Sequence, residues 1–259
     1  MKWIQSAFFK KKKEATTARR RINIGDKEPG YPIYAIGDVH GCIDLLRDAE
    51  NRIANDMILS GRTGLVILLG DYVAKGPASQ TVLDHLIQPS AHGLRRVALC
   101  GNHDDLFYKV IQNPDAHPSW LGQAGKQTLL SYGIDLDYLK SQKGFSSSAL
   151  AEVLKDTIPT EHIDFLASLP VSLKVGSHLF VHAGVRPGVP LDAQRDSDLI
   201  WIREPFISQG PDLPLLVVHG HTPRIEVSFG PGRIGIDTGA FQTGNLTVLK
   251  LDRGDVSIL

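Results

Sequence analysis

The stretch YPIYAIGDVHG, residues 31–41, decides the fold, because a short apolar run ends there in a glycine-rich loop that carries an aspartate and a histidine. The same order recurs in LVILLGDYVAKGP, residues 65–77, and in VALCGNHDD, residues 97–105. Each apolar run has the length of a strand and is followed at once by polar residues. The pattern predicts three strands that end in chemically active loops: Ile33–Ile36, Leu65–Leu69 and Val97–Leu99.

Amphipathic helices are predicted between these strands. Apolar residues recur at spacings of three and four over residues 43–57, and a shorter apolar stripe covers residues 82–87. Asp38, Asp71 and Asn102 follow one another at intervals of roughly 30 residues, the length of a strand–helix–strand unit. We therefore expect parallel neighbouring strands whose carboxyl ends meet at one crevice.

The rest of the chain divides into a helical part and a strand-rich part. The segment Asn113–Leu169 is polar with helical spacing, and prolines and glycines interrupt it, which predicts a helical cap. After Pro170 short apolar and β-branched runs return and predict a second sheet. Its expected strands are Val171–Val175, Leu179–Val181, Leu215–Val218, Ile225–Phe229, Ile234–Ile236 and Leu246–Leu251.

Composition narrows the class of protein. A chain of 259 residues with 42% hydrophobic and 22% charged residues fits one large globular domain. Lysine plus arginine equals aspartate plus glutamate at 28 each, so no overall field favours bulk nucleic-acid binding. The two cysteines, Cys42 and Cys100, are too few for a disulfide framework and indicate a reducing, cytoplasmic setting. No apolar run reaches the roughly 20 residues of a membrane span.

The first thirty residues differ from the remainder. Lys10–Lys13 and Arg19–Arg21 form two basic runs, which predicts a flexible tail over residues 1–30 and a catalytic domain over residues 31–259. A second interpretation is weak contact with an anionic membrane. Apolar residues precede the lysines, and an apolar anchor beside a polybasic run can bind acidic lipid: Trp3, Ile4, Phe8 and Phe9.

Five strand-end loops carry oxygen and imidazole donors without any thiolate: Asp38, His40, Asp71, Asn102, His103, His182 and His221. Such donors suit manganese, iron, zinc or magnesium. A single carboxylate can bridge two ions, and Asp71 lies in the middle loop of the first three. The predicted ligands are then Asp38 and His40 for one ion and Asn102, His182 and His221 for the other. His219 is expected to pack beside the site, and the remaining histidines match no motif.

Several short motifs together carry a resemblance. GDVHG, GDYVAKGP, GNHD, FVHAG and VVHGHT occur in the order typical of the calcineurin-like metallophosphoesterases, and the match covers Tyr31–Leu259. SYG at residues 131–133, WIREPF at 201–206 and IDTGA at 236–240 resemble the bacterial branch of the phosphoprotein phosphatases. That branch contains serine/threonine phosphatases and symmetrical diadenosine tetraphosphatases. The resemblance implies an α/β sandwich of two mixed sheets flanked by helices, with a helical cap and a dinuclear centre, most typically of Mn²⁺.

The resemblance also implies roles for individual residues. Two cations about 3.5–4 Å apart would activate a bridging water or hydroxide for in-line attack on phosphorus. His103 is expected to act as general acid towards the leaving oxygen, and Asp104 to orient its imidazole and raise its pKa. The residues expected to bind the substrate phosphate are Lys75, Arg203, Arg186 and Asn102.

One motif departs from the family pattern. Ala74 and Lys75 stand where the family carries aspartate and arginine, so a carboxylate is lost and a forked cation becomes a point charge. Three functions therefore remain open. The first is a phosphatase for phosphoserine and phosphothreonine in proteins. The second is a hydrolase of dinucleoside tetraphosphates or RNA caps, and the third is a weakened phosphate-binding scaffold.

Overall fold

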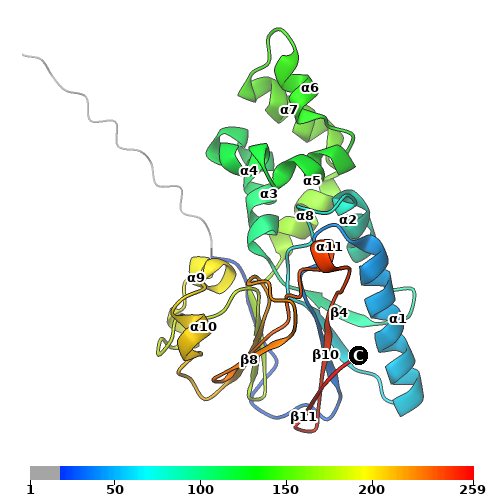
Figure 1. Cartoon of the computed structure of the whole chain (residues 1–259), viewed down its shortest axis with the longest axis vertical. Helices are drawn as coiled ribbons and strands as arrows, with labels where there is room; N and C mark the ends of the chain where they lie inside the picture. The colour runs from blue at the N-terminus through cyan, green and yellow to red at the C-terminus, as the bar shows by residue number, and fades with distance from the viewer. Residues whose placement is uncertain (1–17) are drawn as a thin grey trace, which may run out of the picture.

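Two β-sheets face each other and bring several strand ends to one edge of the sandwich, as the computed structural model of residues 18–259 shows (Figure 1). The first sheet has the order β11-β10-β2-β3-β4. Its members are β2 (Ile33–Ile36), β3 (Leu65–Leu68), β4 (Arg95–Ala98), β10 (Val248–Asp252) and β11 (Asp255–Ile258). The strands β2, β3 and β4 run parallel, as predicted, while β10 and β11 extend the sheet in antiparallel fashion.

The register of the parallel strands aligns their loops. Ile36 pairs with Leu68, and Leu68 pairs with Ala98, so the three strands end at one level. All of β2 is buried because both faces of this sheet are covered, which explains why its sequence is continuously apolar.

The second sheet has the order β1-β5-β6-β7-β9-β8 and mixes parallel and antiparallel pairs. Its members are β1 (Arg21–Asn23), β5 (Ser172–Val175), β6 (His178–Val181), β7 (Leu216–His219), β8 (Ser228–Gly230) and β9 (Arg233–Gly235). The strand expected at Ile225–Phe229 begins later, because Ile225 is 85% exposed in a loop. The run expected at Leu246–Leu251 forms β10 and pairs with β2 in the first sheet instead of joining the second. The two mixed sheets confirm the predicted fold class.

Apolar side chains from both sheets fill the space between them. Ile33, Ile67 and Leu99 from the first sheet pack in one cluster with Phe180 and Val218 from the second. Alternate residues of β2 point the other way, towards the helices, as the two-residue period of a strand requires. Packed side chains therefore support the strand ends from which the loops of the site begin.

Helices cover the outer faces and form the cap. The long helix α1 (Ile43–Ser60) runs along the first sheet and ends at Gly61, whose φ of 65° closes the C-terminus. The others near the sheets are α2 (Ser79–Ile87), α3 (Asn102–Gln112), η2 (Leu191–Ala193), α9 (Asp196–Trp201), α10 (Phe206–Gln209) and α11 (Ala240–Thr243).

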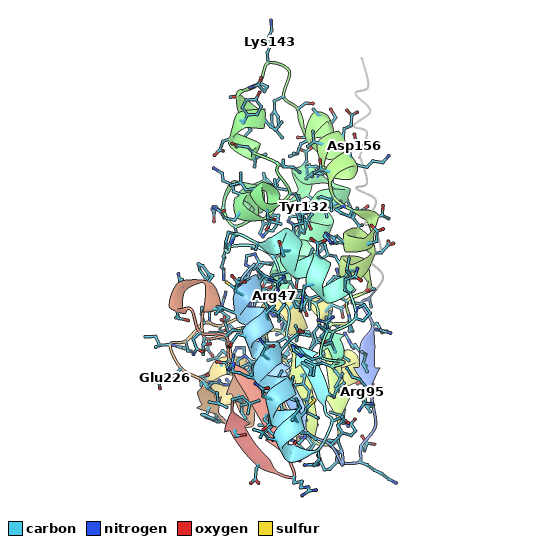
Figure 2. All side chains as sticks on the ribbon, turned by 90° about the vertical axis from the view of Figure 1, so that its right-hand side faces the viewer. Arg47, Arg95, Tyr132, Lys143, Asp156 and Glu226 are labelled. Carbon is cyan, nitrogen blue, oxygen red and sulfur yellow. The ribbon has the colours of Figure 1, made fainter. Side chains whose placement is uncertain are left out.

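The segment predicted as a cap is helical and projects beyond the sheets. In Figure 2, Lys143 marks its far tip, and Tyr132 lies between that tip and the end of α1 that carries Arg47. Its elements are η1 (Pro114–Ala116), α4 (Pro118–Gly122), α5 (Gly125–Ser131), α6 (Leu136–Ser141), α7 (Ser147–Thr157) and α8 (Thr160–Ser168).

The N-terminal segment corrects one expected boundary. Residues 21–23 form β1 and pair in parallel with β5, so the predicted tail boundary at residue 30 is too late. Arg19 and Arg21, which the sequence placed in the tail, bond instead to carboxylates of the folded domain. The residues proposed to touch a membrane lie outside the described part of the chain. Within residues 18–259, the helices are all too short or too polar to cross a bilayer.

Arg19 links the N-terminal segment to the cap, and its removal should destabilise the fold. Its guanidinium donates to Asp105 and to the carbonyl oxygens of Leu166 and Leu169, with the side chain only 12% exposed. Arg19→Ala should lower the melting temperature by roughly 4–12 °C, because bonds to a largely buried charge are lost. Arg20→Ala is the matched control, because Arg20 is exposed. Equal melting temperatures for the two variants would contradict this role.

Candidate metal centre and catalytic cleft

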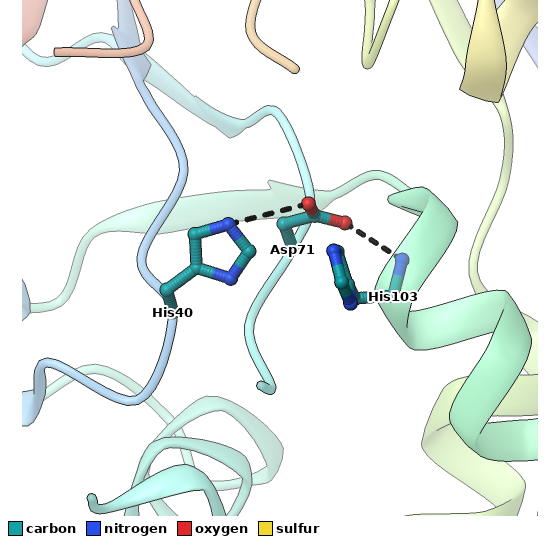
Figure 3. A group of neighbouring side chains, drawn as sticks. All are labelled: His40, Asp71 and His103. Atoms are coloured by element: carbon teal, nitrogen blue, oxygen red, sulfur yellow. Dashed lines mark hydrogen bonds and ion pairs between the residues drawn. The ribbon is translucent and has the colours of Figure 1, made fainter. Parts of the chain in front are cut away.

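Asp71 lies at the centre of the site because Gly70 and Gly101 let the two loops meet closely. It follows β3 with a φ of 53° and is 2% exposed. A Cβ on Gly101 would lie 2.2 Å from both the backbone nitrogen and Oδ1 of Asp71, so only glycine fits there. Oδ1 of Asp71 accepts a hydrogen bond from the backbone N–H of His103 at 2.9 Å, and Oδ2 lies 3.4 Å from Nε2 of His40 (Figure 3).

Two histidines are oriented by backbone carbonyls so that Nε2 faces Asp71. Nδ1 of His40 donates to the carbonyl of Val73 at 2.9 Å, and Nδ1 of His182 donates to that of Leu69 at 3.0 Å. A carbonyl can only accept, so the lone pair of each ring lies on Nε2. That atom of His182 is 3.4 Å from Oδ1 of Asp71. Both rings are therefore arranged as metal ligands usually are.

Asn102 completes a second group of donors. Its Oδ1 lies 2.9 Å from Nε2 of His182 and 2.8 Å from Nδ1 of His221. Asp71, His182 and His221 each offer one ligand atom within 4.8 Å of the others, and all three are buried. The structure thus brings together the whole set expected for one ion.

The first group of donors differs in detail from the expected one. His40, Asp71 and His103 offer atoms within 4.8 Å of one another, and Asp38 is outside that grouping. Both oxygens of Asp38 accept from the backbone N–H of His221, at 3.3 and 3.1 Å. Asp38 is nevertheless buried beside the group, 2% exposed, in the loop that also carries His40.

A carboxylate that the sequence reasoning did not assign lies here as well. Asp237 is 4% exposed and interacts with Asp38. Burial raises the pKa of Asp38 well above its usual range, and the charges of Asp237 and Asp71 add to this shift. Asp237 lies just after strand β9, in the IDTGA motif, and this position is the sequence signal that could have identified it.

The arrangement fits two divalent cations. Burial alone would raise the pKa of Asp71, but the neighbouring imidazoles of His182, His103 and His40 outweigh it and lower that pKa. Asp71 therefore stays an anionic ligand between the two donor groups. Crowded buried carboxylates repel one another, and a divalent cation relieves that repulsion while accepting the imidazole lone pairs. His40, Asp71 and Asp38 would hold one ion, and Asp71, Asn102, His182 and His221 the other.

A cleft of about 320 Å³ opens above these donors. Its lining includes Lys75 and Arg203, which were expected to bind phosphate, together with His103, Trp120 and Trp201. Arg186 differs from its expected role. Its guanidinium is 53% exposed and pairs with Asp198 at 3.0 Å, and it is not part of the cleft lining within the described residues.

Asp104 also differs from its expected role. Its carboxylate accepts hydrogen bonds from the backbone N–H groups of Asp71, Tyr72 and Gly101, at 2.7, 2.9 and 2.9 Å. As the third residue of α3 it turns back towards the helix start, as a capping carboxylate does, and bonds to backbone N–H groups. Asp104 therefore braces the Asp71 loop. The partner of His103 is Trp120, which the sequence reasoning missed.

The protein-family comparison decides the classification. The model for calcineurin-like phosphoesterases matches residues 31–249. The chain belongs to the calcineurin-like phosphoesterase family. The donor groups described above fit the metal dependence of this family.

Relatives of this phosphoesterase include nucleotide hydrolases. It is 30% identical over 154 residues to a symmetrical bis(5'-nucleosyl)-tetraphosphatase of Janthinobacterium sp. (strain Marseille), covering 60% of this chain and 44% of the relative. It is 23% identical over 235 residues to the asymmetrical bis(5'-nucleosyl)-tetraphosphatase PrpE of Anoxybacillus flavithermus, covering 83% and 88%. The chain thus spans less than half of the first relative's length.

The solved structures agree on the fold. A candidate diadenosine tetraphosphatase superposes with a TM-score of 0.62 at 21% identity and covers 93% of this chain and 97% of its own. At that identity the likeness shows the shared fold of the phosphoesterase domain.

Lys75 places a positive charge beside the first donor group. Its Nζ lies 2.8 Å from Nε2 of His40 and 5.2 Å above the ring of Phe241. Ala74 and Lys75 both adopt positive φ, 72° and 64°, which turns the ammonium into the site. A cation at this point competes with a metal ion for the same imidazole lone pair.

Replacement of Lys75 should therefore strengthen metal binding at the first position. We expect Lys75→Met to bind the second equivalent of Mn²⁺ about tenfold more tightly, because the competing ammonium is removed, and changes next to metal ligands alter affinity by about this factor or more. Isothermal titration of chelator-treated protein measures it. Lys126→Met is the control, because Lys126 pairs with Asp137 in the cap. Unchanged or weaker binding in Lys75→Met would contradict the competition.

Proposed function

We propose that this phosphoesterase hydrolyses phosphate monoesters of serine and threonine side chains in proteins. The observation that carries the proposal is the size of the cleft. About 320 Å³ is near the lower end of ligand sites, which span roughly 300–1,000 Å³. That volume suits a phosphoryl group and a short side chain better than two nucleosides joined by four phosphates.

Each polar residue of the cleft has a separate role towards such a substrate. Two bound divalent ions would supply an activated water and neutralise phosphoryl oxygens during in-line displacement. Arg203 can grip phosphoryl oxygens with its forked guanidinium, whereas Lys75 offers a single point charge. His103 lies beside Asp71 and can stabilise the leaving oxygen of the substrate. Asn102 can orient the phosphoryl group through its amide while holding its place in the second donor group.

A dinucleoside tetraphosphate hydrolase is the second candidate. It is supported by the relatives named as bis(5'-nucleosyl)-tetraphosphatases and by the two tryptophans in the cleft lining. Trp201 is 42% exposed at the end of α9, so one face of its ring is available to a nucleobase. Stacking of a base on an aromatic ring contributes about 1–3 kcal/mol.

One substrate panel separates these functions. Manganese-loaded protein is assayed with a phosphoserine peptide, p-nitrophenyl phosphate and diadenosine tetraphosphate, as wild type and as Trp201→Leu. The proposal requires the highest kcat/KM with the phosphoserine peptide. A higher kcat/KM for the dinucleotide, lowered selectively in Trp201→Leu, would establish the second candidate. Absence of turnover in metal-loaded protein would leave the scaffold hypothesis.

A further inference from the structure

A tryptophan of the cap touches the histidine that serves the leaving oxygen. Nε1 of Trp120, in α4, lies 2.9 Å from Nδ1 of His103, in α3. The two rings have centroids 6.5 Å apart and planes inclined at 43°, so the contact is an edge-directed hydrogen bond and not a stack. It joins the cap to the active site through a direct polar bond.

The direction of this bond is unambiguous. An indole N–H can only donate, so Nδ1 of His103 must accept. A neutral imidazole carries one ring hydrogen, which then lies on Nε2. Figure 3 shows one ring nitrogen of His103 turned towards Asp71, and because Nδ1 is held by Trp120 this nitrogen is Nε2. The cleft therefore receives an N–H donor.

Packing fixes Trp120 in place. Its side chain is 6% exposed, and its ring lies 5.9 Å from that of Phe107 on α3. A Cβ on Gly125 would come within 2.6 Å of the indole, so the missing side chain of that glycine makes room for the ring. The indole is thus held on two sides.

Among residues 18–259, the hydrogen-bond partner of Nδ1 of His103 is the indole of Trp120 and not a carboxylate. Ala74, in the loop that also carries Asp71, has no carboxylate, and its N–H donates to Oγ1 of Thr128. Asp104 is engaged with backbone N–H groups. A general acid would need a second ring hydrogen on Nδ1, where it would face the indole N–H directly. The geometry favours a hydrogen-bond donor at His103 over a proton donor.

We propose that Trp120 is a positioning residue that holds His103 with its Nε2–H directed at the substrate. His103 then stabilises a phosphoryl or leaving oxygen by hydrogen bonding, and the cap completes the active site. The role rests on the phosphoester hydrolysis proposed above. It also makes catalysis dependent on how the cap sits, because the bond is lost when α4 moves away from α3.

The test compares Trp120→Phe, which keeps an aromatic ring but loses the N–H, with Tyr138→Phe as the matched control, because Tyr138 is an exposed cap residue that also loses one polar hydrogen. Zinc-loaded protein is used for nitrogen-15 NMR of the histidine rings, since zinc is diamagnetic. Wild type and Tyr138→Phe should show His103 in the Nε2–H form, whereas Trp120→Phe should show a mixture of both forms. Inorganic phosphate should bind several-fold more weakly to Trp120→Phe than to the control.

Kinetics provide the second measurement. With whichever phosphoester of the panel reacts fastest, kcat of Trp120→Phe should fall about tenfold while KM changes little, as for loss of one hydrogen bond. An Nδ1–H form in wild type, or equal phosphate binding and kcat in the two variants, would overturn the proposal. The NMR and phosphate measurements need no turnover, so failure of the proposed substrate is distinguished from failure of this role.

Discussion

Replacing Asp71 with asparagine is expected to lower kcat by roughly a thousandfold or more. Asp71 is the carboxylate between both groups of donors, so its loss weakens both metal positions. Metal ions contribute several kcal/mol of transition-state stabilisation, and each 1.36 kcal/mol is about tenfold in rate. Asparagine is the right replacement because it tolerates the positive φ of 53° at this position.

The control and the readouts make this result specific. Asp44→Asn changes a side chain that is 94% exposed on α1, and it should leave kcat unchanged. Elemental analysis after dialysis should find less than two equivalents of metal in Asp71→Asn and two in the control. A variant that binds two ions and still turns over at the wild-type rate would show that Asp71 is not the shared ligand.

Replacement of His103 should have the second largest effect and should depend on the replacement chosen. His103→Ala is expected to lower kcat about a hundredfold to a thousandfold, the usual effect of removing one donor to a developing oxyanion. His103→Gln should recover part of that loss, because its amide N–H can donate where Nε2–H did. Kinetics with one substrate and full metal occupancy provide the comparison.

A double variant, His103→Ala with Trp120→Phe, tests whether Trp120 acts through His103. If Trp120 acts only through His103, then Trp120→Phe should cause no further loss in the His103→Ala background. Equal loss in His103→Ala and His103→Gln would instead favour proton transfer by the histidine. Unchanged metal content in both variants excludes an indirect effect through Asn102, its neighbour in sequence.

Local patterns predicted the parts of the site that lie directly after strands. β2 and β3 were predictable because each is an apolar run before a glycine-containing loop. The apolar run Val97–Leu99 predicted only the end of β4, which starts at Arg95, and the parallel register of the three strands brings their loops together. The donors Asp71, Asn102, His182 and His221 converge for the same reason. For these donors, the residue type and its position directly after a strand are enough to predict the site from the sequence.

The remaining features depend on contacts between distant segments. Trp120 meets His103 only because the cap folds onto α3, and no motif surrounds it. Asp104 was assigned to its neighbour in sequence, whereas the first turn of a helix directs it backwards to four backbone N–H groups. β1 was missed because its pairing with β5 outweighs the basic, polar character of its surroundings.

The position of the donors between the two sheets has a mechanical consequence. Asp71 follows a strand of the first sheet, while His182 and His221 follow strands of the second. An ion bound by all three cross-links the halves of the sandwich, and a ligand held only by the native state raises the free energy of unfolding. Chelation should therefore lower the melting temperature of wild type more than that of Asp71→Asn. The melting temperature therefore reports whether a bound ion links the two sheets, and this measurement needs no substrate.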